Sequence, residues 1–168
     1  MNHSPSSHRL RSFLSLSIPD TFTVDRICRC IYRGQLSLYT IFTAKHIYDK
    51  ALQRINFDET LKHHRKLVEN HYLVFISCVI IASKVYMDLS YTNISWTEIC
   101  HFPVVHLNRT ERLVLRIIDY DVIVPFPILE QISISYGCSR KHQKKNEERC
   151  GVFRRFFSRI LSPFMCMS

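Results

Sequence analysis

ENHYLVFISCVIIASKVYMD, residues 69–88, is the stretch that decides the fold. Between Tyr72 and Ala82 it carries no charged residue, and Ser77 is its one polar interruption. Placed on a helix, the apolar residues cover every face, which predicts a helix surrounded by other helices rather than one lying on a surface. Such a helix would be roughly 30 Å long, about the width of a small domain. We therefore expect the rest of the chain to pack around it.

Two other interpretations of this stretch are disfavoured. A membrane span needs ~20 mostly apolar residues, and this apolar run is shorter and is closed by Lys84. A buried strand competes because Val and Ile are abundant, but a strand of this length is unusual and the chain has few turn glycines. Lys84 itself has two interpretations: either its stem lies along the rim of the core, or it marks the edge of a docking surface.

The composition fits one all-α domain. The chain has 168 residues, 46% hydrophobic content, 3 Gly and 6 Pro, so its long segments without breakers suit helices better than hairpins. Its 7 Cys are odd in number and form no CxxC pair, which is typical of a reduced, intracellular protein. Its 9 His show no second ligand pair beside His63 and His64, so we expect no metal site and no cofactor. The sequence contains no GxSxG, HExxH or P-loop motif, so we expect no enzyme.

The net charge of +9 is concentrated in the chain ends. Residues 12–139 hold 13 Lys/Arg and 12 Asp/Glu, whereas residues 140–168 hold 8 Lys/Arg and 2 Glu. This near-neutral central portion disfavours nucleic acid as a partner, because such a partner calls for clustered positive charge. We expect a disordered leader over residues 1–21, a helical domain over residues 22–136 and a basic tail over residues 137–168.

The basic tail has several interpretations. The Lys and Arg residues at 140–145 form either a nuclear-localisation signal or a solvated charge run. Farther on, four apolar residues alternate with arginines in an amphipathic pattern: Phe153, Phe156, Phe157 and Ile160. This pattern indicates a helix on a membrane surface or against a partner, or else a terminal helix docked on the domain. We expect an intracellular protein, nuclear and/or cytoplasmic, whose residues 140–168 direct localisation or partner choice.

The segment before the central helix predicts two helices. The first covers residues 24–32 and ends at Gly34, where a glycine tolerates left-handed backbone geometry. Ser37 caps the second helix, which runs to about Arg54 on a helical repeat of apolar residues. A polar link over residues 56–66 follows, and Asp58 is a candidate cap for a short turn there.

The segment after the central helix predicts two more helices and a short terminal one. Ser95 and Glu98 fit a capping box that begins a fourth helix, which ends near His101. Asn108 and Glu111 fit the same pattern at the start of a fifth helix, which runs to about residue 119. Residues 128–136 are apolar enough for one more short helix on the core.

Several short motifs, taken in order, resemble those of the cyclin box. Ala82-Ser83-Lys84 is similar to the ASK motif that ends the central helix of cyclins, and Tyr48-Asp49-Lys50 resembles their IDR segment. Asp88, Tyr91-Thr92-Asn93 and Trp96 resemble a pattern of single-box cyclins of the phosphate-regulation type and of the plant P and U types. The segment from Leu107 to Val122, with Glu111, Leu115 and Asp119-Tyr120, resembles their LNxxE…L…DF/Y.L segment. The resemblance covers residues 24–125, a single cyclin box.

Two positions depart from the pattern of the phosphate-regulation type. Cys100-His101-Phe102 stands where a Gly-Gly loop is usual, and Tyr72-Leu73 stands where His-Arg is usual. These departures leave the expected fold of five helices around a buried third helix unchanged. They leave the identity of the partner kinase open.

The resemblance implies a regulatory subunit that binds a cyclin-dependent protein kinase and controls its activity or substrate choice, with no small-molecule substrate. By position, Lys84 and Glu111 would bond to the kinase backbone near its mobile regulatory helix. Apolar residues that match the cyclin contact surface are Ile81, Val85, Leu115 and Tyr120. The resemblance leaves a cell-cycle role and a phosphate-signalling role both open. The alternative function is a cyclin-fold interaction module, such as a transcription factor, that does not activate a kinase.

Some of these residues also have purely structural interpretations. Glu111 is expected at the third position of its helix, where it would serve as a capping-box residue, with or without a second role at an interface. Asp49 is expected to pair with Lys45 or with a neighbouring helix. Without the family argument, Tyr120 would be placed in the core.

Overall fold

The computed structural model describes residues 7–64, 66 and 69–137, and these contain seven α-helices, one 3-10 helix and no strand. In chain order they are α1 (Ser7–Leu14), α2 (Thr21–Arg33), α3 (Leu38–Phe57), η1 (Glu59–His64), α5 (His71–Tyr86), α6 (Asn93–Cys100), α7 (Val104–Ile117) and α8 (Phe126–Ser135). The expected all-α fold is confirmed. Contacts separate a unit over Met1–Tyr136 from a second unit over Gly137–Ser168. The localisation signal and amphipathic pattern predicted for the tail lie outside the described residues.

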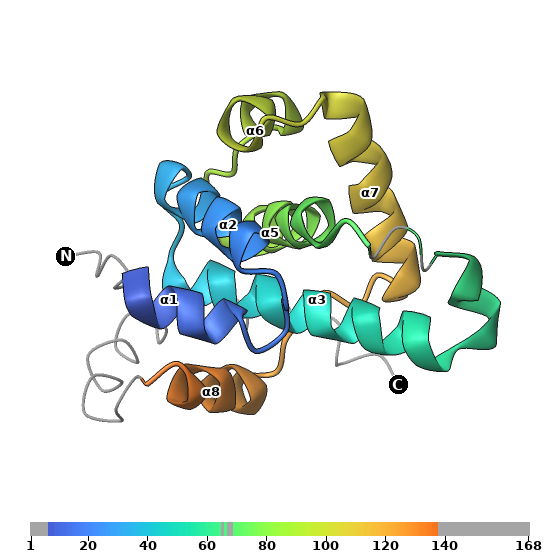
Figure 1. Cartoon of the computed structure of the whole chain (residues 1–168), viewed down its shortest axis with the longest axis horizontal. Helices are drawn as coiled ribbons and strands as arrows, with labels where there is room; N and C mark the ends of the chain where they lie inside the picture. Colours follow the sequence, from blue (N-terminus) through green and yellow to red (C-terminus); the bar gives the residue numbers. More distant parts are fainter. Residues whose placement is uncertain (1–6, 65, 67–68, 138–168) are drawn as a thin grey trace, which may run out of the picture. The chain divides into compact units, whose positions relative to one another are not determined.

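The central helix α5 is surrounded as its sequence predicts. Figure 1 shows it at the middle of the first unit, with α2, α3, α6 and α7 around it. Every residue from Tyr72 to Ser83 is buried. The two buried serines bond to the helix itself, since Ser77 Oγ donates to the Leu73 carbonyl at 2.9 Å and Ser83 Oγ donates to the Ile80 carbonyl at 2.8 Å. These bonds satisfy hydroxyls that would otherwise destabilise the core.

The ends of the first helices follow the predicted caps, with one correction. Ser37 caps α3 by accepting from the Thr40 amide at 3.1 Å, and Asp58 accepts from the Thr60 amide at 2.9 Å at the start of η1. Gly34 ends α2 with right-handed geometry at φ −76°, so the expected left-handed glycine is wrong. The next residue, Gln35, takes the left-handed conformation at φ 49°. Glycine still suits position 34, because an added Cβ would lie 3.2 Å from the Cys30 carbonyl oxygen.

The predicted starts of α6 and α7 are both wrong. Thr92 caps α6 by accepting from the Ser95 amide at 3.2 Å, so Ser95 lies inside the helix. Helix α7 begins after Pro103, whose φ of −59° suits a residue at a helix start, and so Asn108 is in mid-helix. Glu111 is therefore in the interior of α7 rather than in its first turn. The capping-box interpretation of Glu111 is wrong, and its position has to be explained by its side-chain contacts.

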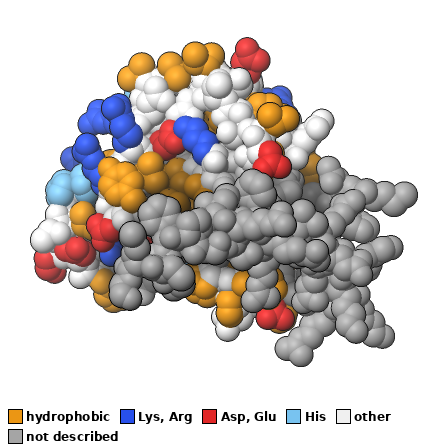
Figure 2. All heavy atoms as spheres, turned by 180° about the vertical axis from the view of Figure 1, so that it is seen from behind, with side chains coloured by type: hydrophobic (Ala, Val, Ile, Leu, Met, Phe, Trp, Pro, Cys, Tyr) orange, Lys and Arg blue, Asp and Glu red, His pale blue; other side chains and the backbone are white. Residues whose placement is uncertain are grey.

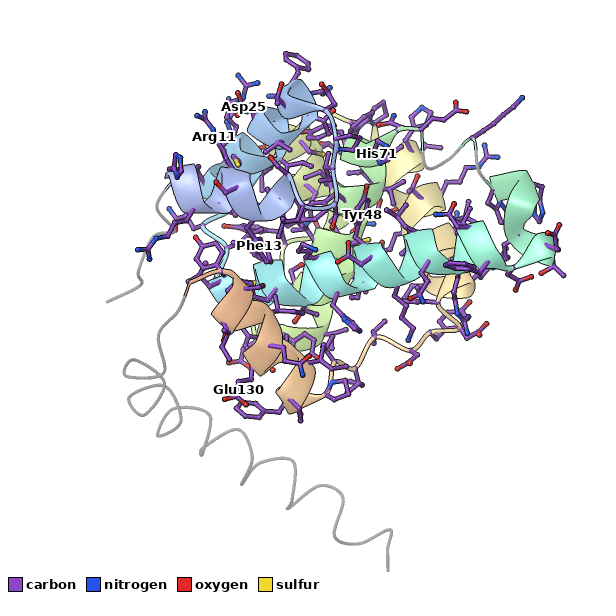
Figure 3. The ribbon with its side chains drawn as sticks, turned by 60° about the horizontal axis from the view of Figure 1, so that its bottom comes forward. Arg11, Phe13, Asp25, Tyr48, His71 and Glu130 are labelled. Atoms are coloured by element: carbon purple, nitrogen blue, oxygen red, sulfur yellow. The ribbon has the colours of Figure 1, made fainter. Side chains whose placement is uncertain are left out.

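The N-terminal segment corrects the expectation of a disordered leader over residues 1–21. Residues 7–14 form α1, and four apolar side chains of this region are buried: Leu10, Phe13, Leu14 and Ile18. The Phe13 ring packs edge-on against Phe42 of α3 and Tyr136 after α8, with ring centroids 5.5 Å and 5.3 Å apart. Arg11 forms an ion pair with Asp25 of α2 at 2.8 Å (Figure 3). Ser12 and Ser15, which interrupt the apolar residues in the sequence, lie on the exposed face of the segment.

Candidate partner-binding site

An ion pair joins the last turn of α5 to the middle of α7. Lys84 Nζ lies 2.6 Å from Glu111 Oε1, and the side chains are 39% and 12% exposed. Sequence reasoning placed both residues at one surface, and the structure brings them into direct contact. The carboxylate is the more deeply buried partner, so its charge depends on hydrogen-bond donors held nearby.

Asn93 supplies the second donor to this carboxylate. Its Nδ2 lies 2.6 Å from Glu111 Oε2 and also 2.6 Å from Asn108 Oδ1. Asn93 is the first residue of α6, directly after the Thr92 cap, so the start of α6 fixes the direction of its amide. Three helices thus meet at one carboxylate. We call Lys84, Asn93 and Glu111 the carboxylate network.

Asn93 was not among the predicted site residues. The signal for Asn93 in the sequence is its place in Tyr91-Thr92-Asn93, a motif of the cyclin resemblance. Its role depends on α6 beginning at residue 93, whereas the sequence favoured a start at Ser95. The Asn93 Oδ1 atom is buried and has no hydrogen-bond partner within the described part of the chain.

A shallow hollow of ≈ 670 Å³ adjoins the carboxylate network. Its lining combines polar groups of the network with apolar side chains: Lys84, Ser90, Tyr91, Thr92, Asn93, Asn108, Glu111, Arg112 and Leu115. Tyr91 is 39% exposed and packs edge-on against the buried ring of Trp96 at 5.9 Å. The hollow therefore offers apolar contact area next to fixed hydrogen-bonding groups, and protein interfaces combine apolar contacts with direct hydrogen bonds.

The other predicted contact residues divide into exposed and buried ones. Val85 is 38% exposed, Tyr120 is 64% exposed, and Leu115 is half-buried at the hollow. Ile81 is only 2% exposed, so its assignment to the contact surface is wrong. It lies one turn before Lys84 and Val85 on α5 and faces the core. The placement of Tyr120 in the core, suggested without the family argument, is also wrong.

Tyr120 is held out from the surface by a constrained loop after α7. Asp119 and Tyr120 both have left-handed backbone, with φ of 52° and 57°, which costs about 1–2 kcal/mol per non-glycine residue. Two cations of α3 hold this loop: Arg54 donates to the Ile117 carbonyl at 2.8 Å and pairs with Asp119, and Lys50 pairs with Asp121. The hydrogen bond from Lys50 lowers the pKa of Asp121. The predicted pair of Lys45 with Asp49 is confirmed at 2.6 Å, next to this region of α3.

The chemistry available elsewhere in the described residues is limited. No group of three or more His, Cys, Asp or Glu side chains within them could hold a metal ion. Four cysteines are free and buried, namely Cys28, Cys30, Cys78 and Cys100. Burial raises the pKa of the Cys28 thiol to about 11, so this thiol stays protonated and unreactive at neutral pH. Among the helices that the structure describes, none is long and apolar enough to cross a membrane.

Comparison with known families identifies the class of protein. The model of the cyclin N-terminal domain matches residues 21–123, a range that begins with α2 and ends after α7. This match spans more than half of the chain, and the chain belongs to the cyclin family, with a single cyclin box. No curated protein and no solved structure matches the chain significantly.

Proposed function

We propose that this chain is a regulatory subunit that binds a cyclin-dependent protein kinase and controls its activity or its choice of substrate. The observation that carries the proposal is the carboxylate network at the end of α5, within the region matched by the cyclin N-terminal domain. A helix-end lysine paired with a mostly buried glutamate offers both donors and acceptors to a partner's backbone. The chain itself would perform no catalysis.

The proposed contact surface consists of Lys84, Val85, Glu111, Leu115 and Tyr120. Asn93 belongs to it as the residue that positions the Glu111 carboxylate. Apolar area on Val85, Leu115 and Tyr120 would supply most of the affinity, since removing such area from water drives association. The charged groups would fix the register of docking more than they would increase affinity.

Regulation would follow from differential contacts with two kinase conformations. A kinase is active only when the lysine of its N-terminal sheet and the glutamate of its mobile helix are paired around the phosphates. A surface that binds this helix in its inward position, and not in its outward one, shifts the population towards the active state. The chain needs no moving part of its own for this, and the ion pairs that join α3 to the loop around Tyr120 are consistent with a fixed surface.

The second candidate function is a cyclin-fold interaction module that does not activate a kinase. Nucleic acid remains a poor fit as its partner, because residues 12–139 are nearly neutral. Figure 2 shows apolar, acidic and basic side chains interspersed on one face of the described part, without a broad field of one sign. The proposal has further parts. The chain would belong to the phosphate-regulation or plant subclass of cyclins and would act in the cell cycle or in phosphate signalling. It would be nuclear and/or cytoplasmic, and residues 140–168 would direct its localisation.

Co-purification with a panel of cyclin-dependent kinases, followed by a kinase assay, tests the proposal. We expect one kinase to be retained, and we expect Lys84→Ala and Glu111→Ala each to reduce retention at least tenfold. Arg9→Ala and Glu98→Ala are matched controls, because both residues are exposed and neither belongs to the carboxylate network. Retention without activation would support the interaction module instead. A folded chain that retains no kinase would overturn the proposal.

A further inference from the structure

Helix α2 carries three arginines on one face. Arg26, Arg29 and Arg33 are spaced three and four residues apart, so their side chains leave the helix on the same side. Arg29 and Arg33 are exposed and Arg26 is half-buried. Most buried residues of α2 lie on the opposite face, namely Val24, Ile27, Cys28 and Ile31, and buried Cys30 borders the arginines, with its Sγ 2.9 Å from the Tyr72 hydroxyl. We call the three residues the arginine stripe.

No carboxylate in the described part of the chain forms an ion pair with the arginine stripe. Asp25 lies beside it on α2, but this carboxylate binds Arg11 of α1 at 2.8 Å. Figure 3 shows Arg11 and Asp25 close to each other, on the neighbouring helices α1 and α2. Helix α6 packs against α2, but its Glu98 also forms no ion pair with the arginine stripe. None of the three guanidinium groups therefore has a carboxylate within ion-pair distance in the described part of the chain.

Two of the three guanidinium groups are held in place by other elements. The Arg26 guanidinium lies over the Tyr72 ring at 3.9 Å from its centroid and within 6.0 Å of the Phe22 ring. The Arg33 guanidinium lies 2.8 Å from His101 Nε2, at the C-terminal end of α6. Stacked or bonded arginines lose less conformational freedom when they bind an anion, because their orientation is already set. Mobile surface arginines of an ordinary solvated helix face have no such supports.

We propose that the arginine stripe binds an anionic peptide segment, through phosphate or carboxylate groups placed three residues apart. Arg26 and Arg33 are seven residues apart on α2, a rise of about 10 Å. Three residues of an extended peptide span about 10 Å as well. A segment lying along α2 would therefore place one anionic group at each end of the stripe, with Arg29 between them. Guanidinium groups bind both kinds of oxyanion in bidentate fashion.

This surface is distinct from the carboxylate network. Tyr72, which supports Arg26, lies in the first turn of α5, whereas Lys84 lies in its last turn, about 18 Å farther along the helix. The inference therefore does not depend on kinase binding. A phosphate or carboxylate segment is favoured over nucleic acid because the stripe is a single short row with the acidic Asp25 at its flank.

Fluorescence anisotropy of labelled peptides, titrated with the full chain, tests the proposal. One peptide carries two phosphoserines three residues apart, a second carries aspartates at the same positions, and a third carries unmodified serines. A fourth peptide places the two phosphoserines on adjacent residues. Arg29→Gln combined with Arg33→Gln, the stripe variant, removes two of the three charges of the arginine stripe and keeps the stacked Arg26. Arg109→Gln combined with Arg116→Gln is the matched control, because it removes the same charge from exposed positions of α7.

We expect the peptide with spaced phosphates to bind at least tenfold more weakly to the stripe variant and less than twofold more weakly to the control variant. Tight binding of the aspartate peptide would identify carboxylates as a source of the anion, and binding of the phosphopeptide alone would identify phosphate. Equal weakening by both variants would overturn the proposal, because the binding would then reflect net charge alone. Failure of the folded chain to bind any peptide, or stripe-dependent binding of a single-stranded oligonucleotide in preference to the peptides, would also overturn it.

Discussion

The unequal burial of Lys84 and Glu111 predicts that removing one partner of their ion pair lowers the free energy of unfolding more than removing the other. The Glu111 side chain is 12% exposed and that of Lys84 is 39% exposed. In Lys84→Met the mostly buried carboxylate loses its cation and keeps only the Asn93 amide, which we expect to lower the free energy of unfolding by about 2 kcal/mol. In Glu111→Gln the lysine can turn towards water, so we expect a decrease of about 1 kcal/mol.

The double variant Lys84→Met/Glu111→Gln distinguishes an unpaired buried charge from a simple loss of contacts as the cause of destabilisation. With Gln at position 111 the site contains no buried charge, so adding Lys84→Met should have little further effect. We expect the double variant to lose about 1 kcal/mol, well below the summed single effects of about 3 kcal/mol. Helix propensity hardly changes in either substitution, since all four residue types are good helix formers.

Urea unfolding followed by far-UV circular dichroism provides the measurement. Arg109→Met serves as the control, because Arg109 is exposed on α7, the helix that carries Glu111. This substitution should change the free energy of unfolding by less than about 0.5 kcal/mol. Equal effects of the two single variants, or additive effects in the double variant, would refute the reasoning. Each single variant should nevertheless remain folded, so weaker retention of the proposed kinase partner by either variant would be attributable to the surface.

Three further predictions test other parts of the structure. Ile80→Asp should prevent folding, as judged by loss of helical circular dichroism, because it buries an unpaired charge at a side chain that is 0% exposed. Tyr120→Gly should raise the free energy of unfolding by up to about 1 kcal/mol in urea unfolding, because it relieves left-handed strain at φ 57°. The same variant should retain the proposed kinase partner more weakly. A destabilised variant would contradict this prediction. The free energy of unfolding should fall as the pH rises from about 9 towards 11, because burial raises the pKa of the Cys28 thiol to about 11 while the unfolded thiol ionises near 8.5. Over that range the folded state binds more protons, and Cys28→Ala should make the fall shallower; an unchanged pH dependence would contradict this account.

The central helix shows what the sequence could predict. An uncharged run with apolar residues on every face has to bury its side chains on all sides and still pair its backbone N–H and C=O groups. A helix enclosed by other helices is the simplest structure that does both. Lys84 was identified for the same reason, because a single cation that closes such a run has to reach the surface. The cyclin resemblance predicts Glu111 at the same surface, and the structure brings the two side chains together.

The errors have two sources, competing local signals and tertiary contacts. Ser95 and Asn108 fit good capping patterns, but Thr92 and Pro103 are local start signals that stand earlier in the sequence, and the two helices begin there. Ile81 matched a contact position, but its direction on α5 depends on how α3 and α7 pack against that helix. Within residues 7–14, Leu10, Phe13 and Leu14 stand at i, i+3 and i+4, so a short helical signal was present in the sequence, although it covers a single turn. Residues 7–14 are helical next to α2, α3 and Tyr136, whose contacts no local pattern reveals.

Hydrogen–deuterium exchange on the complex with the retained kinase tests the central claim most directly. The account predicts that the kinase slows exchange in the last turn of α5, in residues 88–93 and in the second half of α7, where the carboxylate network and its hollow lie. Exchange in the first turns of α2 should be unchanged. Protection confined to α2, with no change around Lys84 and Glu111, would contradict the account, because the kinase would then bind elsewhere on the cyclin box.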